Sequence, residues 1–513
     1  MIEKVRTRIA PSPTGFLHIG TARAALFNYI FAKQNQGQFI LRIEDTDSER
    51  SRPEYEKNIM ESLEWLGLKC DEFYKQSERL DIYEKYIRKL LDENKVYYCF
   101  CTEEELEAQK QYQISVGQAL LYSGKCRKLS KKEVEKNLKE KKPFVIRFKI
   151  PESVKKIVFE DLVREKIEFD SSLIGDFIIS KGLKKPFYNF AAAVDDFEMK
   201  ISHVIRGEDH ISNTPKQILI QQALGFSQPK YAHLPLILGP DRSKLSKRHG
   251  ATAISEYREK GVLLETLINF MAFLGWNPGT EREIYNIVSL IKEFSLDNIQ
   301  KGGAVFNVKR LDYLNGFYIR QKSDKKITEL CIPYLIKANL IEQVTATIEN
   351  CSPKENSSQK FELFKEKKPE FKIKETDEVI SCDYLKKVVK AYQERLRYLS
   401  EIAELTDFFF KDKLEYDKNL LKWKDMNYKQ VLEILDKLEE ILSKIEEKDF
   451  NKENLEKILM IEAERTGDRG ELLWPLRVAL TGKKASAPPF EVAEILGKEK
   501  TLKRVRGARE QFS

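Results

Sequence analysis

The chain has 513 residues, 42% of them hydrophobic, 11% aromatic and 33% charged, with a net charge of +8 at pH 7. A chain of this length is usually too long for one hydrophobic core, and its apolar content excludes wholesale disorder, so we expect several folded domains. The small excess of positive charge favours polyanionic partners without identifying one. No run approaches the ~20 apolar residues of a membrane span and the N-terminal residues lack the apolar region of a secretory signal, so we expect a cytoplasmic protein with no membrane partner and with reduced thiols.

The first 100 residues alternate strand and helix signals. Residues 5–9 and 39–43 are short segments typical of strands, and residues 22–33 between them have the periodicity of a helix. Strand, helix and strand in this order favour a βαβ unit and a parallel sheet, which predicts an α/β fold. The segment Pro11-Ser-Pro-Thr-Gly15 forbids regular structure directly after the first strand, where open α/β sheets bind their ligands.

Residues from about 97 to 186 follow a different pattern. They contain a close pair of Cys residues, Lys-rich tracts and strand-like runs such as Pro143–Ile150. Alternating signals of the first kind resume near Asn189 and continue through Val204–Arg206 and His233–Leu238. We therefore expect an inserted α+β domain that interrupts the sheet.

Beyond about Gly316 the composition shifts to Lys, Glu, Leu and Ile, with few turn signals. Apolar residues recur there at helical spacing while basic residues occupy the other faces, and the apolar set is Leu385, Val388, Val389, Tyr392, Leu396, Leu399 and Ile402. This pattern predicts a helical C-terminal third. The Lys- and Glu-rich tracts near 352–376 are typical of a surface loop or linker.

A candidate phosphate site follows the first irregular segment. His18, Ile19, Gly20 and Thr21 lead into the helix expected from Ala22. Gly20 permits close approach of the backbone, and a helix start offers unpaired N–H groups and a positive dipole end, which together suit a polyphosphate. His18 can donate to a phosphate oxygen, but a histidine near a helix start, taken alone, is more often a structural or capping residue.

A second candidate element lies more than 200 residues later, between Gly239 and Gly250. Lys244, Lys247 and Arg248 stand there among Gly, Pro and Ser, a composition typical of a mobile loop instead of a packed helix. Such a cationic loop can close over a triphosphate and stabilise charge that develops in phosphoryl or nucleotidyl transfer. By itself the segment would also fit a plain solvated run of charges.

Taken together, Pro11-Ser-Pro-Thr-Gly-Phe-Leu-His-Ile-Gly-Thr21 and Lys244-Leu-Ser-Lys-Arg248 resemble the two signatures of class I aminoacyl-tRNA synthetases, and in particular the bacterial-type glutamyl-tRNA synthetases. The resemblance runs nearly end to end, through Arg42–Asp47, Tyr188–Phe190, Val194–Asp196, His203–His210, Phe273–Trp276 and Pro475–Gly482. Thr21 stands at the second His of the general signature, a variation familiar in glutamyl and glutaminyl enzymes.

The resemblance implies the domain organisation. A Rossmann-type catalytic domain would occupy residues 1–96 and 187–320, and an inserted domain at 97–186 would hold the acceptor end of tRNA. All-α tRNA-binding domains would follow, namely a helical stem-contact domain at 321–384 and an anticodon-binding domain at 385–513.

The resemblance also implies that the chain is a glutamate–tRNA ligase. It would form glutamyl-adenylate from L-glutamate and ATP with Mg²⁺ and then charge tRNA(Glu). Whether tRNA(Gln) is a second acceptor stays open. His18, Gly20 and Thr21 would contact the ATP phosphates, and Lys244 and Lys247 would close on them. The family reaction needs no protein nucleophile, so positioning and electrostatics would supply the acceleration. The family generally favours a monomer.

For the amino acid, the resemblance places Ser12 and Glu44 at the α-amino group and Arg8, Tyr188 and Arg206 around the two carboxylates, without deciding which Arg serves which. Neutral glutamine would leave a buried guanidinium without its anion, which is a large penalty. Aspartate is shorter by one methylene, a difference that hydrophobic contact discriminates by only about 1–3 kcal/mol. Charge is therefore expected to dominate selectivity.

A zinc site is expected in the insertion. Cys99 and Cys101 are followed by Tyr122 and Cys126, and Lys128 stands where some relatives carry a His ligand. The resemblance to a Tyr-x-x-x-Cys variant gives the ligand set Cys99, Cys101, Tyr122 and Cys126, with reduced and unliganded thiols as the alternative. The remaining cysteines are isolated and read as ordinary core or surface residues: Cys70, Cys331, Cys351 and Cys382.

Three alternatives were weighed. Glutaminyl-tRNA synthetases share the signatures but end in β-barrels, whose repeated short strands residues 320–513 lack. Shorter glutamyl-transferring relatives that modify a tRNA base have no anticodon domain, and the length of this chain argues against them. A catalytically inactive tRNA- or nucleotide-binding paralogue would not need His18, Glu44, Lys244 and Lys247.

Overall fold

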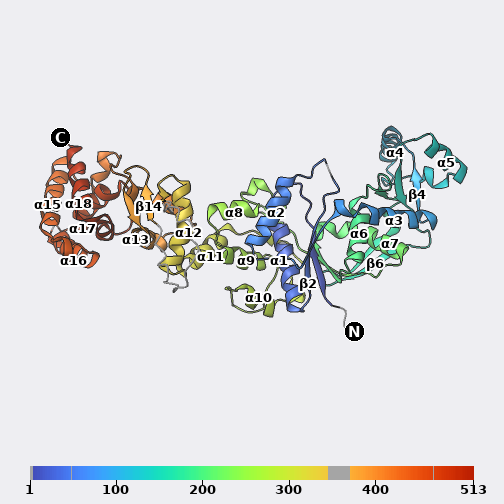
Figure 1. Ribbon diagram of the computed structural model, residues 1–513, viewed down its shortest axis with the longest axis horizontal. Coiled ribbons are helices and arrows are strands. Elements are labelled where there is room, and N and C mark those ends of the chain that lie inside the picture. The colour runs from blue at the N-terminus through green and yellow to red at the C-terminus, as the bar shows by residue number, and fades with distance from the viewer. Residues whose placement is uncertain (1–3, 48, 345–369, 466, 513) are drawn as a thin grey trace, which may run out of the picture. The chain divides into compact units, whose positions relative to one another are not determined.

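The computed structural model describes residues 4–47, 49–344, 370–465 and 467–512 (Figure 1). They form two compact units, each with its own internal contacts. The first contains Met1–Glu259 and Leu264–Leu311, and the second contains Lys260–Leu263 and Asp312–Ser513. None of the helices in the described ranges combines the length and apolarity needed to cross a membrane.

A parallel sheet organises the first unit. Strands β1 (Arg6–Ile9), β2 (Gln38–Ile43) and β3 (Glu72–Lys75) pair in parallel, as do β9 (His203–Gly207) and β10 (Lys230–Leu234). The two groups meet beside β1, where the backbone N–H of Ser202 donates to the Arg6 carbonyl at 3.0 Å. The resulting order, β3-β2-β1-β9-β10, is that of a doubly wound α/β sheet, and the predicted βαβ start is confirmed.

Three helices of the sheet region begin where the sequence supplies a cap or proline. The helix α1 starts after His18, and both α2 and α7 carry Pro in their first turn, where the missing N–H costs nothing. The helices of this region are α1 (Ile19–Gln34), α2 (Pro53–Trp65), α3 (Leu80–Asp92), α6 (Tyr188–Glu198), α7 (Thr214–Leu224), α8 (Ile254–Lys260), α9 (Leu264–Ala272) and α10 (Ile287–Glu293).

The insertion is built around a small antiparallel sheet. Strands β4 (Val96–Cys99), β5 (Val145–Phe148) and β8 (Ile178–Ser180) pair side by side, and the flanking helices are α4 (Glu103–Ser115) and α5 (Lys131–Lys139). Both helices begin with a capping box, from Thr102 and Ser130 respectively, which satisfies their first N–H groups.

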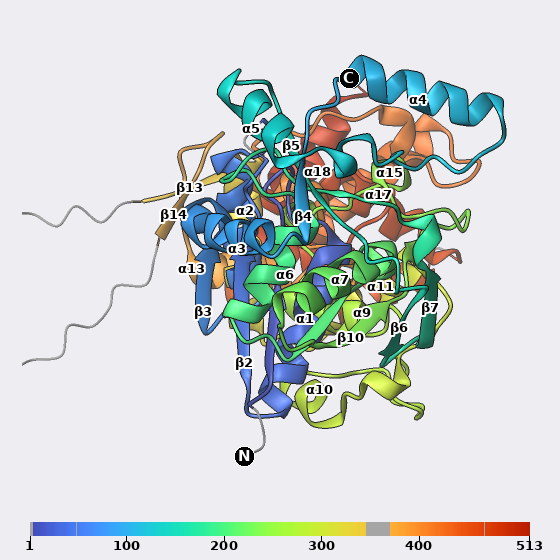
Figure 2. The same ribbon diagram turned by 90° about the vertical axis from the view of Figure 1, so that its right-hand side faces the viewer.

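One part of the insertion continues the parallel sheet. The hairpin of β6 (Lys156–Asp161) and β7 (Glu165–Asp170) lies beside β10, to which β6 pairs in parallel (Figure 2). Side chains of the insertion, such as Phe148 and Phe159, share one buried cluster with Ile40 and Val204 of the parallel sheet. The insertion therefore packs as an extension of the sheet.

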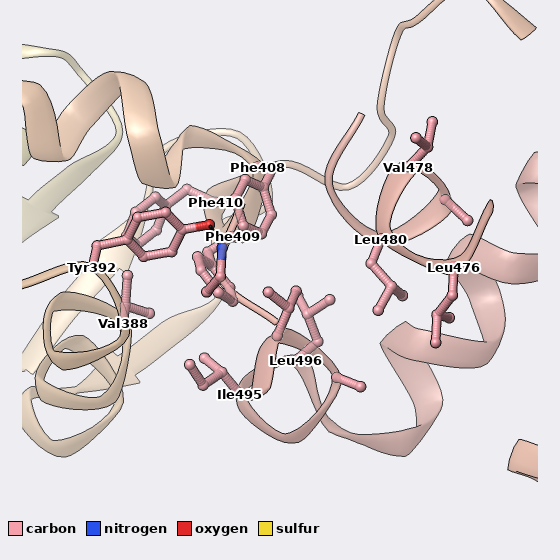
Figure 3. Packing of buried hydrophobic residues seen from close by; sticks show 14 of the residues in the cluster. Val388, Tyr392, Phe408, Phe409, Phe410, Leu476, Val478, Leu480, Ile495 and Leu496 are labelled. Atoms are coloured by element: carbon pink, nitrogen blue, oxygen red, sulfur yellow. Dashed lines mark hydrogen bonds between the residues drawn. The ribbon is translucent and has the colours of Figure 1, made fainter. Parts of the chain in front are cut away.

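The second unit is mainly helical, as predicted. Its core joins residues far apart in the sequence, and Figure 3 shows Phe408, Phe409 and Phe410 packed near Tyr392 and Leu496. Its helices are α12 (Asp324–Lys337), α13 (Cys382–Gln393), α14 (Glu401–Thr406), α15 (Tyr428–Lys444), α16 (Lys452–Arg465), α17 (Arg469–Thr481) and α18 (Pro489–Glu510), and α11 (Val308–Arg320) precedes them.

The apolar pattern of residues 385–402 is buried in full, but it covers two helices. The first, α13, ends at Gln393, and Leu396 and Leu399 are buried in the turns before α14. The unit also contains a small antiparallel sheet of β13 (Ile341–Gln343), β14 (Glu370–Ile373) and β15 (Val379–Ser381). The expectation of a loop is therefore wrong for residues 370–373; residues 352–369 lie outside the described part.

Candidate active site

The turn before α1 presents a neutral histidine at a helix start. His18 is the N-cap residue, and its Nδ1 accepts a hydrogen bond from the Gly20 N–H at 3.0 Å. Burial and the nearby Lys244 ammonium lower the pKa of His18, so the ring carries one proton, on Nε2. The structure thus provides an Nε2–H donor on His18, beside Gly20 and Thr21. These two residues belong to the first turn of α1, whose backbone N–H groups have no acceptor within the helix.

The cationic segment forms an ordered hairpin next to this turn. The backbone N–H of Gly239 donates to Ser243 O at 2.8 Å, and Arg242 takes a φ of +60° at the tip. Beyond it, η5 (Lys247–His249) is a short 3₁₀ helix. Asp241 accepts hydrogen bonds from Ser243 and Arg248, which fold the loop on itself.

The backbone joins the two segments. The chain after the hairpin pairs with the His18 turn: the Ile19 N–H donates to Thr252 O at 2.8 Å, and the Ile254 N–H donates to Leu17 O at 2.9 Å. A single antiparallel bridge links His18 with Ala253. The two stretches, more than 200 residues apart in sequence, therefore lie together.

Among the described residues, Lys244 has one acidic partner. Its Nζ lies 3.0 Å from Asp209 Oδ2, and the lysine side chain is 63% exposed. Although burial opposes the effect, the hydrogen bond from Lys244 lowers the pKa of Asp209. The pair keeps the ammonium next to the His18 turn while leaving it accessible; the side chain of Lys247 lies outside the part of the chain that the structure describes.

A buried cluster of charges lies under the carboxyl ends of β1 and β2. Arg42 is fully buried and donates to Glu44 at 3.1 Å and to Asp196 at 2.8 Å, and it lies 3.8 Å from Asp195. The Nε of Arg8 donates to the same Asp196 at 3.1 Å, and this is the one hydrogen bond of the Arg8 side chain within the described ranges. Burial raises the pKa of Glu44, against the pull of Arg42 and Arg8. These contacts pre-position Arg8 and Glu44.

Arg206 differs from Arg8 and Arg42 because all its partners are neutral. From β9 its guanidinium donates to Tyr188 Oη at 3.2 Å, His233 Nε2 at 3.2 Å and Thr214 Oγ1 at 2.8 Å. The residue is 6% exposed, and no carboxylate of the described residues lies within ion-pair distance of it. A buried cation of this kind is costly unless a ligand supplies the anion.

Tyr188 and Ser12 complete the expected set. Tyr188 opens α6, and its hydroxyl lies 3.0 Å from His210 Nδ1 as well as near Arg206. Ser12 is exposed in the loop after β1, whose neighbouring Pro11 carbonyl accepts from the Glu44 N–H at 3.0 Å. The loop therefore brings Ser12 near Glu44 through the backbone.

Three residues of this site were not singled out from the sequence: Asp196, Asp209 and His233. The signal for Asp196 was present, because Arg42 interrupts the apolar strand 39–43 and needs a buried acid. The partnerships of Asp209 and His233 depend on the pairing of strands distant in sequence, which no local pattern reveals.

A cluster of thiols in the insertion matches the predicted ligand set. The sulfur atoms of Cys99, Cys101 and Cys126 lie within 4.8 Å of one another, and Cys101 and Cys126 are 3.6 Å apart. The Tyr122 hydroxyl lies 3.4 Å from Cys99 Sγ and 3.3 Å from Cys101 Sγ. Tetrahedral zinc with Zn–S bonds of about 2.3 Å separates its sulfur ligands by about 3.7 Å, so the four groups fit.

Burial raises the pKa of Cys101 to about 12, which favours its protonated form unless a cation is bound. The side chains of Cys70, Cys331 and Cys382 are free thiols outside this cluster; Cys351 lies outside the described residues.

Comparison with known proteins identifies the family. The family described as tRNA synthetases class I (E and Q), catalytic domain, matches residues 4–313, and an anticodon binding domain matches residues 327–509. The chain is 46% identical over 517 residues to glutamate–tRNA ligase 1 of Caldicellulosiruptor saccharolyticus, with 98% of each chain covered. It is 43% identical over 516 residues to the glutamate–tRNA ligase of Aquifex aeolicus, with 100% of each covered. 

A solved structure agrees with this over the whole length. The crystal structure of a glutamate tRNA ligase from Elizabethkingia meningosepticum, in complex with its amino acid, matches with a TM-score of 0.82 and 33% identity and covers 100% of both chains. The chain therefore belongs to the E and Q family of class I tRNA synthetases.

Proposed function

We propose that the chain is a glutamate–tRNA ligase. It activates L-glutamate with ATP, releases pyrophosphate and transfers the glutamyl group to the 3' end of tRNA(Glu). Membership of the family, full-length relatives that carry this name and a matched anticodon binding domain support the proposal. The observation that carries the choice of amino acid is the buried Arg206, which has no acidic partner within the described residues.

Glutamate has one cationic and two anionic groups, and the site offers a complement for each. Glu44, with Ser12 above it, receives the ammonium group. The α-carboxylate lies within two bonds of that ammonium and is assigned to Arg8, because Arg42 bonds both to Glu44 and to the Asp196 that holds Arg8. Arg206, with Tyr188, is left for the side-chain carboxylate.

This division explains selectivity against glutamine. The neutral amide of glutamine would leave the Arg206 guanidinium buried beside neutral groups only, so the site would keep its desolvation cost without gaining an ion pair.

ATP binds with its phosphates at the start of α1. His18 donates from Nε2, Gly20 allows the backbone to approach, and Thr21 lies in the same turn. Lys244 and Lys247 approach from the hairpin and stabilise negative charge on the phosphates as the α-carboxylate attacks the α-phosphorus. Mg²⁺ accompanies the triphosphate and neutralises part of its charge. Because Asp209 holds Lys244 next to His18, this electrostatic environment exists before substrate binds.

The cysteine cluster holds a structural Zn²⁺ through Cys99, Cys101, Tyr122 and Cys126. Its geometry suits a closed, four-coordinate site, which has no open position for catalysis. With zinc bound, these four residues would fix the end of β4 to the loop that carries Tyr122 and Cys126. The insertion then presents a rigid surface to the acceptor end of tRNA, and the helical second unit reads the anticodon. The enzyme works as a monomer in the cytoplasm.

Charging assays test the proposal. Purified protein with ATP, Mg²⁺ and radiolabelled glutamate should acylate tRNA(Glu), and a parallel reaction with tRNA(Gln) determines whether that tRNA is also a substrate. Glutamine should not be attached to either tRNA. Exchange of Lys247 for Ala should slow adenylate formation much more than it weakens tRNA binding. Failure to charge any tRNA with glutamate would contradict the proposal.

A further inference from the structure

The orientation of Arg206 depends on a histidine in the neighbouring strand. His233 lies on β10, directly opposite Arg206 of β9 in the parallel register, and it is fully buried. Its Nε2 accepts the Nε–H of Arg206 at 3.2 Å. His233 belongs to none of the motifs assigned to substrate, and it contacts the proposed glutamate-binding arginine at Nε, whereas Tyr188 contacts Nη1.

On its other side His233 meets a carboxylate of the insertion. Asp161 ends β6, and its Oδ2 lies 2.6 Å from His233 Nδ1. Its Oδ1 accepts three backbone N–H groups, from His233 at 3.2 Å, Val163 at 3.0 Å and Arg164 at 2.8 Å. An ionised carboxylate can only accept, so the proton of the imidazole must be on Nδ1. The lone pair of Nε2 then faces Arg206 Nε at 3.2 Å and the Thr214 hydroxyl at 3.1 Å.

The imidazole is neutral in this position. Burial lowers the pKa of His233 in opposition to Asp161, and the positive charge of Arg206 acts in the same direction as burial. A second proton on Nε2 would point at the Arg206 N–H and remove the acceptor.

The consequence for Arg206 follows from its donor count. A guanidinium has five N–H groups. His233 engages the one on Nε, Tyr188 takes one on Nη1 and Thr214 takes one on Nη2. One N–H then remains on each terminal nitrogen, which is the pair of donors that a bidentate carboxylate needs.

We propose that Asp161 and His233 are positioning residues for glutamate recognition: Asp161 fixes the Nδ1–H tautomer of His233, and His233 holds Arg206 with two terminal donors directed to the substrate carboxylate. This inference rests on the proposed function. It gives the β6 hairpin of the insertion a role in amino-acid binding as well as in extending the sheet.

The exchange Asp161→Asn tests the tautomer directly. The three backbone donors at Oδ1 hold the amide oxygen there, so the amide NH₂ faces His233 Nδ1 and forces the proton to Nε2, against Arg206. We expect the KM for glutamate to rise about 10- to 100-fold, while the KM values for ATP and tRNA stay within about twofold. Glu160→Gln, at an exposed carboxylate of the same strand, is the matched control and should behave as wild type.

Two exchanges of His233 separate positioning from packing. Gln can place an acceptor where Nε2 stood, whereas Asn can only place a donor where Nδ1 stood. His233→Gln should therefore retain a KM for glutamate about tenfold lower than that of His233→Asn. If the two variants have equal KM values, or if folded Asp161→Asn keeps the wild-type KM, the positioning role is refuted.

Arg206→Met in the same assay separates the positioning role of Asp161 and His233 from the proposed carboxylate site at Arg206. If this variant raises the KM for glutamate and the Asp161 and His233 variants do not, only the positioning role fails. If Arg206→Met also binds glutamate normally, the proposed carboxylate site fails with it.

Discussion

Two buried arginines of the site should respond oppositely to the same exchange. Arg206 has neutral partners only among the described residues, whereas Arg42 is surrounded by Glu44, Asp195 and Asp196. Replacing either with Met keeps a similar volume and removes one charge. The effect on stability and the effect on glutamate binding should therefore separate.

For Arg42→Met, buried carboxylates lose their cation, and breaking such an arrangement costs about 3–5 kcal/mol of unfolding free energy. Arg206→Met removes the desolvation cost of a buried guanidinium without an acidic partner, and it also removes the hydrogen bonds to Tyr188, His233 and Thr214. Because these two effects oppose each other, the net change in unfolding free energy should be within about 1 kcal/mol. The loss of the substrate ion pair should cost about 2–5 kcal/mol of binding, which is roughly a 30- to 4000-fold increase in KM for glutamate.

Denaturant unfolding and steady-state charging kinetics measure the two quantities on the same protein preparations. Arg206→Met should unfold near the wild-type midpoint and require far more glutamate, with the KM for ATP nearly unchanged. Arg42→Met should unfold at a clearly lower denaturant concentration. The reasoning is refuted if Arg206→Met loses as much stability as Arg42→Met while its KM for glutamate is unchanged.

The remaining predictions concern the phosphate site, the metal and pH. Lys244→Ala should slow single-turnover adenylate formation by about tenfold or more, because a cation at the phosphates is lost, and an unchanged rate would exclude that role. Elemental analysis should find one zinc per chain in the wild type and less in Cys126→Ser, whose thermal midpoint should fall; a metal-free, equally stable wild type would favour reduced thiols. Burial lowers the pKa of His203 from 6.5 to about 4, so the unfolded state binds more protons between these values and stability should decline as the pH falls through this window. In His203→Gln the unfolding free energy should decline less steeply, because at most one proton fewer is taken up on unfolding. Identical pH slopes for the variant and the wild type would contradict this.

The sequence predicted those parts of the fold that depend on local pattern. The strands 5–9 and 39–43 and the helix between them follow from apolar periodicity, and β1, β2 and α1 occupy nearly these residues. The C-terminal helices were likewise readable from their apolar faces. The small sheet of β13, β14 and β15 was not, because its strands have three or four residues each and lie among Lys and Glu.

Long-range pairing limited what could be predicted of the site. The motifs indicated Arg8, Glu44 and Arg206 as candidates, but the acid that holds Arg8 and Arg42 is Asp196, which is more than 150 residues away from both in sequence. The difference between an arginine paired with an acid and one left for substrate is visible only in three dimensions. The same holds for Asp161, which reaches His233 because β6 pairs with β10.

The central claim is that this site activates an acidic amino acid with ATP, and glutamate-dependent exchange of pyrophosphate into ATP measures that step directly. With tRNA present, the account predicts exchange with glutamate and none with glutamine. No glutamate-dependent exchange with or without tRNA, or exchange that glutamine supports equally well, would contradict it.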